Sequence, residues 1–67
     1  MFQLTAKEVL DQYPHLENML REGAWRKYEL QDALGLTRGE VDMILSVLTS
    51  AGYVENTSLG WRWKRDA

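Results

Sequence analysis

The stretch ALGLTRGEVDMI, residues 33–44, decides how the middle of this 67-residue chain folds. Gly35 closes the helical pattern that precedes it, as glycine commonly does at the end of a helix. Thr37 and Glu40 have the spacing of a capping box, in which a hydroxyl and a carboxylate bind free backbone N–H groups at a helix start. The stretch therefore predicts a helix that ends at Gly35, a short turn, and a second helix that begins at Thr37.

Apolar residues recur at helical spacing on both sides of this turn. Before it, positions i, i+3 and i+4 hold Leu30, Ala33 and Leu34. After it, a longer stripe consists of Val41, Ile44, Leu45 and Leu48. This spacing puts each set on one face of a helix, where it can pack into a shared core. We expect the second helix to cover residues 37–51 and to end at Ala51-Gly52.

Two shorter helices are predicted upstream. Thr5 and Glu8 form another capping box, and the helix after it carries on one side Val9, Leu10 and Tyr13. Pro14 ends this helix, because the residue before a proline is pushed out of the α region, and Pro14 can open the next one. The next helix stops at Gly23 and has a buried stripe of Leu16, Met19 and Leu20.

The C-terminal third is typical of a β-hairpin. Two short strands, 53–56 and 61–64, flank a polar turn at 57–60, and residues 24–26 are long enough only for a bridging strand. Alternate side chains of a strand share a face, so Trp61 and Trp63 point one way and Arg62 and Lys64 the other. We expect both indoles to cover the core and the cations to face solvent or phosphate.

Length and composition exclude several classes of protein. Without cysteine the chain has no disulfide or thiolate metal site, and its one histidine, His15, has no metal-ligand cluster or nucleophile beside it in the sequence. We therefore expect no enzyme, metal, cofactor or small-molecule substrate. Residues 1–5 lack the features of a signal peptide, and no apolar run approaches the ~20 residues that span a bilayer. These features predict a cytoplasmic protein that does not enter a membrane.

Charge is distributed unevenly along the chain. The net charge is −2, all of it carried by residues 1–23, whereas residues 24–67 are neutral. Within that neutral part, residues 61–65, WRWKR, concentrate three positive charges. A local basic ribbon therefore exists in a protein whose acidic total argues weakly against non-specific binding of nucleic acid.

Residues 14–65 resemble the winged helix-turn-helix family. The features that carry the resemblance are Gly35 in the turn, Leu36 as the apolar plug after it, an aliphatic Val41 six residues after the glycine, the ending LTSAGYVEN, and the aromatic and basic returning strand. The resemblance implies a mainly α fold with a small β-hairpin, of the α+β class. It comprises a three-helix core and a C-terminal two-stranded wing within residues 14–67, preceded by a short helical extension, residues 1–13, in a single domain.

The same resemblance implies a function. In that family the second helix of the motif reads the major groove of DNA, and the wing contacts phosphate or the minor groove. We therefore expect a small sequence-specific protein that binds double-stranded DNA, a transcriptional regulator of bacterial, archaeal or phage type. Helix 37–51 would face bases through Arg38, Asp42 and Ser46. Backbone contacts would come from Lys27 and from the wing, residues 53–65, through Arg62, Lys64 and Arg65.

Two acids near the start of the reading helix need explanation, because phosphates repel carboxylates. Glu40 is expected to serve the capping box, where the helix dipole also favours a negative charge. For Asp42 two interpretations stay open, helix-start electrostatics and contact with a partner. A carboxylate in the major groove can accept a hydrogen bond from a cytosine amino group.

A second hypothesis makes this chain a winged-helix protein interaction module, an inhibitor or an assembly subunit. It would bind a protein through the acidic and apolar face of helix 37–51, at Asp42, Met43 and Val47. The N-terminal segment adds further apolar side chains, which either pack over the core or form a homodimer interface: Phe2, Leu4, Val9, Leu10 and Tyr13. A module separated from a longer chain is a third alternative.

Overall fold

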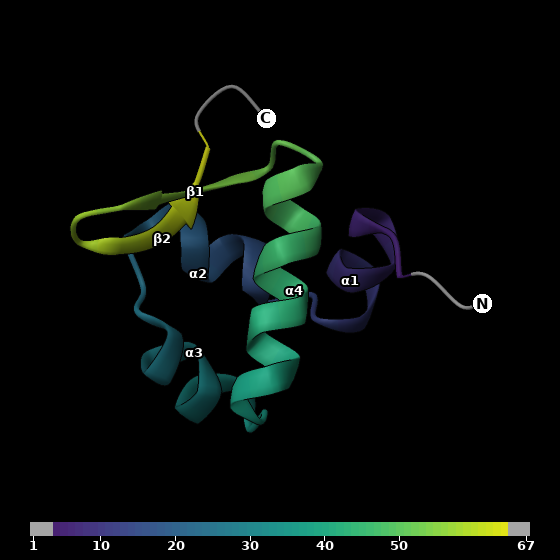
Figure 1. Cartoon of the computed structure of the whole chain (residues 1–67), viewed down its shortest axis with the longest axis horizontal. Helices are drawn as coiled ribbons and strands as arrows, with labels where there is room; N and C mark the ends of the chain where they lie inside the picture. The colour runs from purple at the N-terminus through teal and green to yellow at the C-terminus, as the bar shows by residue number, and fades with distance from the viewer. Residues whose placement is uncertain (1–3, 65–67) are drawn as a thin grey trace.

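Four helices are followed by one β-hairpin in the computed structural model, which describes residues 4–64 (Figure 1). The helices are α1 (Ala6–Gln12), α2 (Leu16–Glu22), α3 (Lys27–Leu34) and α4 (Arg38–Ser50). The hairpin pairs β1 (Val54–Thr57) with β2 (Gly60–Trp63) in antiparallel order. The predicted α+β layout is confirmed: α3 and α4 are two helices joined by a short turn, and the two-stranded hairpin follows them. Phe2 and Arg65 lie outside the described residues.

The turn between α3 and α4 forms as the quoted stretch predicts. Gly35 ends α3 in the left-handed conformation, with φ of 68°, which glycine adopts without steric cost. Thr37 then caps α4. Its hydroxyl accepts from the Glu40 N–H at 3.2 Å, and its own N–H donates to the Glu40 carboxylate at 2.9 Å. Leu36, between them, is half-buried against the core. The chain therefore changes direction over residues 35–37, and α4 starts as a separate helix that packs against α3.

All four helices and both strands contribute side chains to the core. Its buried members are Val9, Leu16, Leu20, Leu30, Val41, Ile44, Leu45, Leu48, Val54 and Trp63. The whole predicted stripe of α4 is among them. Burial of each such aliphatic side chain contributes about 1.5–3 kcal/mol, which matters in a chain this short. The stripe predicted for α3 is wrong at Ala33, which is exposed because this two-turn helix meets the core on the side of Leu30 and Leu34.

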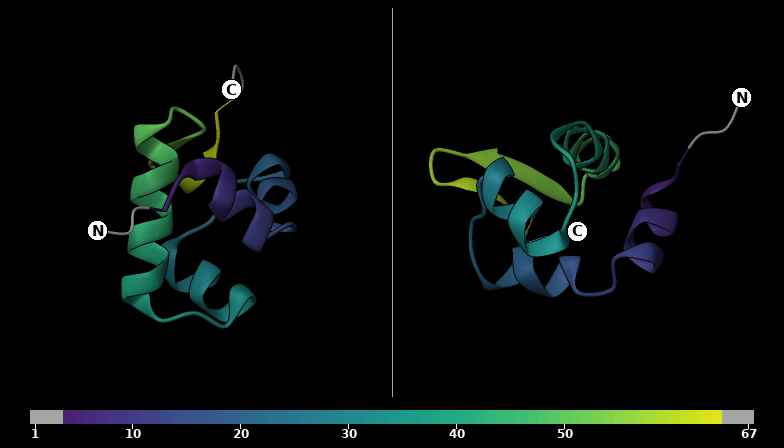
Figure 2. Two further views of the ribbon diagram at one scale, coloured as in Figure 1. Left: turned by 90° about the vertical axis from the view of Figure 1, so that its right-hand side faces the viewer. Right: turned by 90° about the horizontal axis from the view of Figure 1, so that it is seen from below.

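The N-terminal helix belongs to the same core. α1 packs against α4 and buries Val9 completely, with Leu4, Leu10 and Tyr13 half-buried around it. Figure 2 shows α1 on the opposite side of α4 from the hairpin. The expectation that this extension enlarges the core is confirmed. After it, Pro14 and His15 form a turn, so α2 begins at Leu16 rather than at the proline.

The hairpin is anchored to the helices through the predicted bridging strand. The backbone N–H of Trp25 donates to the Trp61 carbonyl at 2.8 Å, and the N–H of Trp61 donates back to the Trp25 carbonyl at 2.7 Å. Each strand has the expected four residues but lies one residue nearer the turn than predicted, because Thr57 pairs with Gly60 around a two-residue loop. The Thr57 hydroxyl donates to the Gly60 carbonyl at 2.7 Å and holds that pair. The wing is thus fixed to the segment that leads into α3.

No helix among the described residues combines the length and the apolar character that a membrane span requires.

Candidate nucleic-acid interface

The solvent face of α4 carries the residues that the sequence assigns to base contacts. Arg38 and Ser46 are exposed, and Asp42 between them is half-buried. Gly39 adds no side chain, and a Cβ placed there would meet no heavy atom within 4 Å. The first three turns of α4 therefore offer a cation and a hydroxyl on a surface with little bulk beside Arg38.

Asp42 has a partner that the sequence pattern does not reveal. Its carboxylate lies 2.7 Å from the ammonium group of Lys27, which stands at the start of α3. Hydrogen bonding to Lys27 lowers the pKa of Asp42 below its ordinary value, although desolvation opposes the shift and the charges of Lys27 and Arg38 add to it. The acid that looked out of place on this face is thus neutralised by a neighbouring helix. Lys27, predicted to contact phosphate, is itself engaged in this ion pair.

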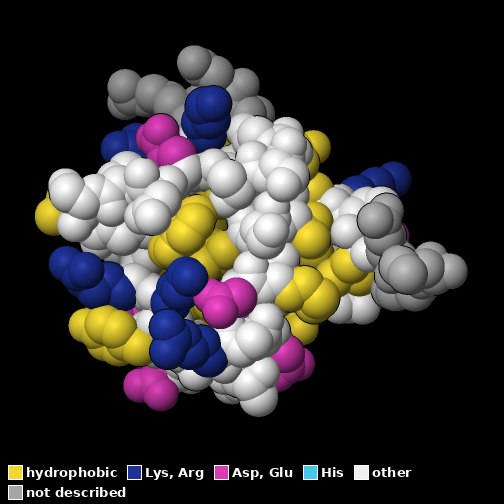
Figure 3. Space-filling view, in the orientation of Figure 1, with side chains coloured by type: hydrophobic (Ala, Val, Ile, Leu, Met, Phe, Trp, Pro, Cys, Tyr) yellow, Lys and Arg dark blue, Asp and Glu magenta, His cyan; other side chains and the backbone are white. Residues whose placement is uncertain are grey.

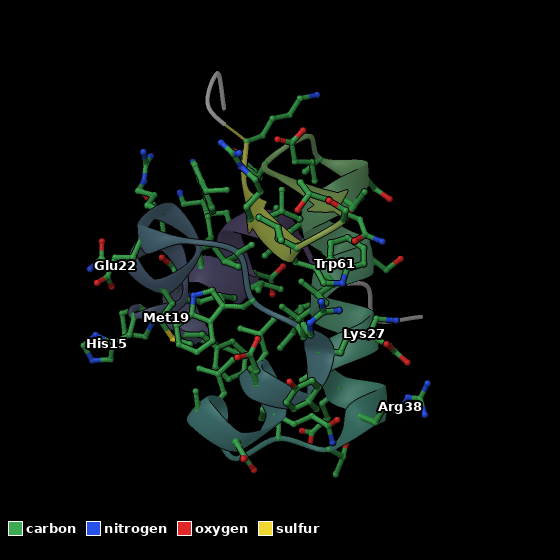
Figure 4. All side chains as sticks on the ribbon, turned by 90° about the vertical axis from the view of Figure 1, so that its left-hand side faces the viewer. His15, Met19, Glu22, Lys27, Arg38 and Trp61 are labelled. Atoms are coloured by element: carbon green, nitrogen blue, oxygen red, sulfur yellow. The ribbon has the colours of Figure 1, made fainter. Side chains whose placement is uncertain are left out.

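Trp61 brings the wing into the same site. The Lys27 ammonium lies 6.0 Å from the centroid of the Trp61 ring, within reach of a cation–π interaction. Figure 4 shows Trp61, Lys27 and Arg38 following one another along the side of α4. Between α4 and β2 runs a groove of about 300 Å³, which we call the α4–wing groove; its lining residues are Lys27, Asp42, Leu45, Ser46, Thr49, Ser50 and Trp61.

The two wing tryptophans, Trp61 and Trp63, differ in burial and in what they contact. Trp63 is buried as expected, stacked on Tyr53 with ring centroids 5.5 Å apart and covered by the Arg21 guanidinium at 5.0 Å. Trp61 packs against the core only in part and lines the α4–wing groove. The expectation that both indoles serve the core is therefore right for Trp63 and incomplete for Trp61. The reason is that Trp61 lies at the bridge with Trp25, where it borders both the core and the α4–wing groove.

The wing cations are exposed on the opposite side of the strand, as the alternation predicts. Arg62 lies 3.5 Å from the carboxylate of Glu55, its direct cross-strand neighbour. Lys64 is exposed, and its backbone N–H donates to the Tyr53 carbonyl at 2.7 Å. Arg65 is outside the described residues. An exposed ion pair such as Arg62–Glu55 is worth only about 0–1 kcal/mol, so Arg62 can exchange Glu55 for a phosphate.

The faces of α4 differ in character. In Figure 3, Lys and Arg side chains gather on the side of α4 toward α3, with hydrophobic side chains beside them, and further hydrophobic side chains lie on the side toward α1. Met43 is 48% exposed, and Val47 is half-buried against the core. Neither lines the α4–wing groove, which contains Asp42. The acidic and apolar parts of the alternative docking face are therefore separated.

The capping residues of α4 lead to a testable prediction. Hydrogen bonds from the Thr37 backbone N–H and hydroxyl lower the pKa of Glu40, which confirms its role as a cap. Replacing Thr37 by alanine is expected to cost about 1 kcal/mol of unfolding free energy. Because the pKa values of Glu40 and Asp42 are lowered on folding, the stability they contribute is present at neutral pH. It is lost as pH falls below about 4, through the lowered values.

Urea unfolding at pH 7 and pH 3 checks this account. Thr37→Ala should lose less stability on acidification than the original protein, because the carboxylate of Glu40 has lost one of its partners. Asp11→Asn, on α1, serves as a control for the loss of an unrelated acid. An equal acid response in the Thr37 variant and the original would contradict a contribution of the Thr37 hydroxyl to the lowered pKa of Glu40.

No protein-family model, curated protein or solved structure matches this chain. Within residues 4–64, no three histidine, aspartate or glutamate side chains gather closely enough to hold a metal ion. The functional assignment therefore rests on the residues and their geometry.

Proposed function

We propose that this chain is a small sequence-specific protein that binds double-stranded DNA, a transcriptional regulator of bacterial, archaeal or phage type that acts in the cytoplasm. In this proposal α4 enters the major groove and offers Arg38, Asp42 and Ser46 to base edges. Lys27 and the wing residues Arg62, Lys64 and Arg65 contact the phosphate backbone.

The observation that carries the proposal is the convergence of three elements on one face. The start of α3, the first turns of α4 and strand β2 bring Lys27, Arg38 and Trp61 to the same side of the molecule (Figure 4). An α-helix with its side chains is about 10–12 Å across, so α4, with its 13 residues, fits a major groove about 12 Å wide. A wing fixed beside such a helix can contact the backbone while the helix reads bases.

The ion pair between Lys27 and Asp42 makes this face more compatible with DNA than its sequence suggests. A free carboxylate near phosphates would weaken binding, but Asp42 is held by an ammonium group 2.7 Å away. On a duplex, Lys27 can turn toward a phosphate while Asp42 accepts from a cytosine amino group. Asp42 then raises the affinity for sites that contain such a cytosine and lowers the affinity for other sites.

An electrophoretic mobility shift with random and selected duplexes tests the proposal. Binding is expected in low salt for both, with tighter binding to duplexes selected from a random pool. On random duplexes, where Lys27 stays paired with Asp42, the three phosphate contacts of Arg62, Lys64 and Arg65 give a slope of roughly −3 in a plot of log affinity against log salt. Absence of any retardation at micromolar protein in low salt would refute the proposal.

Replacing Asp42 by asparagine is expected to strengthen binding to random DNA and to reduce discrimination between random and selected duplexes. On random DNA, where Lys27 otherwise stays paired with Asp42, the substitution frees Lys27 for phosphate, so the salt slope there should become steeper by about one. Asp11→Asn, on the other side of α4, removes the same charge and controls for net charge. Identical affinities and slopes in the two variants would show that Asp42 has no special place in the interface.

A protein-docking function remains the second candidate, because the apolar side chain of Met43 on α4 is 48% exposed. Binding through that face depends on apolar contact, so it changes little as salt rises, whereas contacts with phosphate weaken steeply. A complex with a stoichiometric protein partner that survives high salt, and that Met43→Lys disrupts, would favour this function over DNA binding.

A further inference from the structure

A second concavity lies beside the α4–wing groove, at the start of α3. This α3–α4 cleft has a volume of about 320 Å³, and its lining residues are Arg26, Lys27, Tyr28, Gln31 and Arg38. Three of the five side chains are cationic, and none is a carboxylate. Arg26 lies beside Lys27 at the start of α3, where the sequence suggests a contact with the DNA backbone, whereas Tyr28 and Gln31 are not among the DNA contacts that the sequence predicts.

Two of the cations in the cleft have no carboxylate partner. Among residues 4–64, Arg26 and Arg38 form no ion pair, and only Lys27 is engaged, with Asp42. The nearby acid Glu29 is occupied at the helix start, where its carboxylate accepts the Arg26 backbone N–H at 2.8 Å. Positive charge therefore accumulates at the cleft without being cancelled inside the molecule.

The other two side chains supply hydrogen bonds. Tyr28 is 64% exposed, although a large aromatic side chain usually buries more of its surface, and it brings a hydroxyl to the cleft. Gln31, one turn further along α3, brings an amide. A guanidinium beside hydroxyl and amide donors suits the oxygens of a phosphate group. The first turn of α3, which contains Lys27 and Tyr28, adds the positive end of a helix dipole.

We propose that the α3–α4 cleft is a phosphate-binding site in which Arg26 is the main cationic contact and Tyr28 and Gln31 donate hydrogen bonds. Arg38 stands at the border between this cleft and the solvent face of α4, and its charge raises the local potential while its side chain remains directed to bases. The phosphate belongs either to the DNA backbone, in which case this inference rests on the proposed function, or to a free phosphate compound.

The DNA arm of the test compares Arg26→Gln and Tyr28→Phe with Lys7→Gln, which removes an exposed cation from α1. Arg26 is exposed and caps α3 only through its backbone, so the substitution preserves the fold. For Arg26→Gln, affinity should fall by the same factor on random and selected duplexes, and the salt slope should be shallower by about one. Over a fourfold rise in salt, the variant should then lose roughly threefold less affinity than the original. Tyr28→Phe should weaken both duplexes slightly, and Lys7→Gln should leave the slope unchanged.

The second arm uses inorganic phosphate alone, at an ionic strength held constant with sodium chloride. In ¹⁵N NMR spectra of the original protein, phosphate should cause saturable shifts at the backbone amides of Arg26, Tyr28 and Gln31, and Arg26→Gln should abolish them. If phosphate shifts these amides but Arg26→Gln does not change DNA binding, the cleft binds a free phosphate compound. If Arg26→Gln weakens DNA binding but phosphate causes no shifts, the cleft binds the DNA backbone.

Failure of the cleft and failure of the proposed function give different results. If Arg26→Gln matches Lys7→Gln on DNA and phosphate produces no saturable shift, the cleft is not a phosphate site, although DNA binding stands. If no duplex binds at all, the proposed function falls, and the phosphate titration alone decides the role of the cleft.

Discussion

Replacing Gly60 by alanine is expected to lower the unfolding free energy by about 2–5 kcal/mol. Gly60 begins β2 with φ of 130°, a backbone conformation that other residues rarely adopt. A Cβ at this position would lie 2.7 Å from both the carbonyl carbon and the carbonyl oxygen of Trp25. Backbone strain and this collision add together, because the carbonyl belongs to the bridge that holds the wing. Either the backbone at residue 60 or the carbonyl group of Trp25 must move, so the Trp25–Trp61 hydrogen bonds should be distorted or lost.

Thermal and urea unfolding followed by circular dichroism measure this effect. For a domain of this size, each 1 kcal/mol corresponds to a change in melting temperature of about 4–8 °C. Gly39→Ala is the matched control, since Gly39 lies inside α4 with open space around it. There the same substitution should raise stability by about 0.5–1 kcal/mol. A Gly60→Ala protein as stable as the original would contradict the close approach of β2 to Trp25.

Replacing Arg38 by alanine is expected to weaken binding to a selected duplex by about 1–3 kcal/mol, or roughly 5- to 150-fold. Arg38 is the first residue of α4, is exposed, and forms no ion pair among residues 4–64. A guanidinium there can donate two hydrogen bonds to one guanine, a pairing that no other side chain of α4 can reproduce. The loss should therefore be much smaller on random duplexes, where this base contact is not made.

Fluorescence anisotropy with labelled selected and random duplexes measures this difference. Arg38→Lys is the informative control, because lysine keeps the charge but lacks the planar fork of donors. It should restore most binding to random DNA and little of the preference for the selected sequence. Equal losses on both duplexes in Arg38→Ala would show that Arg38 contacts only phosphate and would remove its role in specificity.

The parts of the fold that depend on neighbouring residues could be predicted from the sequence. The capping box at Thr37 and Glu40 acts across three residues, and the left-handed end of α3 needs only the missing Cβ of Gly35. Both are set by short-range sterics and hydrogen bonds, so they are visible in the stretch itself. The apolar stripe of α4 is equally local, because its spacing alone selects one face of the helix.

Contacts between distant residues could not be predicted in this way. The ion pair of Lys27 with Asp42 depends on how closely α3 approaches α4, and the place of Trp61 depends on the pairing of β2 with Trp25. Ala33 shows the same limit, since helical spacing does not say how much of a short helix its neighbours cover. The α3–α4 cleft arises from the same packing, so its residues look unremarkable when they are considered one by one.

The most direct test of the central claim is a ¹⁵N NMR titration of the protein with the duplex that binds most tightly. DNA binding through the proposed face predicts that the largest shifts fall on the first three turns of α4, on the start of α3 and on β2. Amides of α1 should change little. Shifts confined to α1 and Met43, or no shifts at all in low salt, would contradict the assignment of this face to DNA.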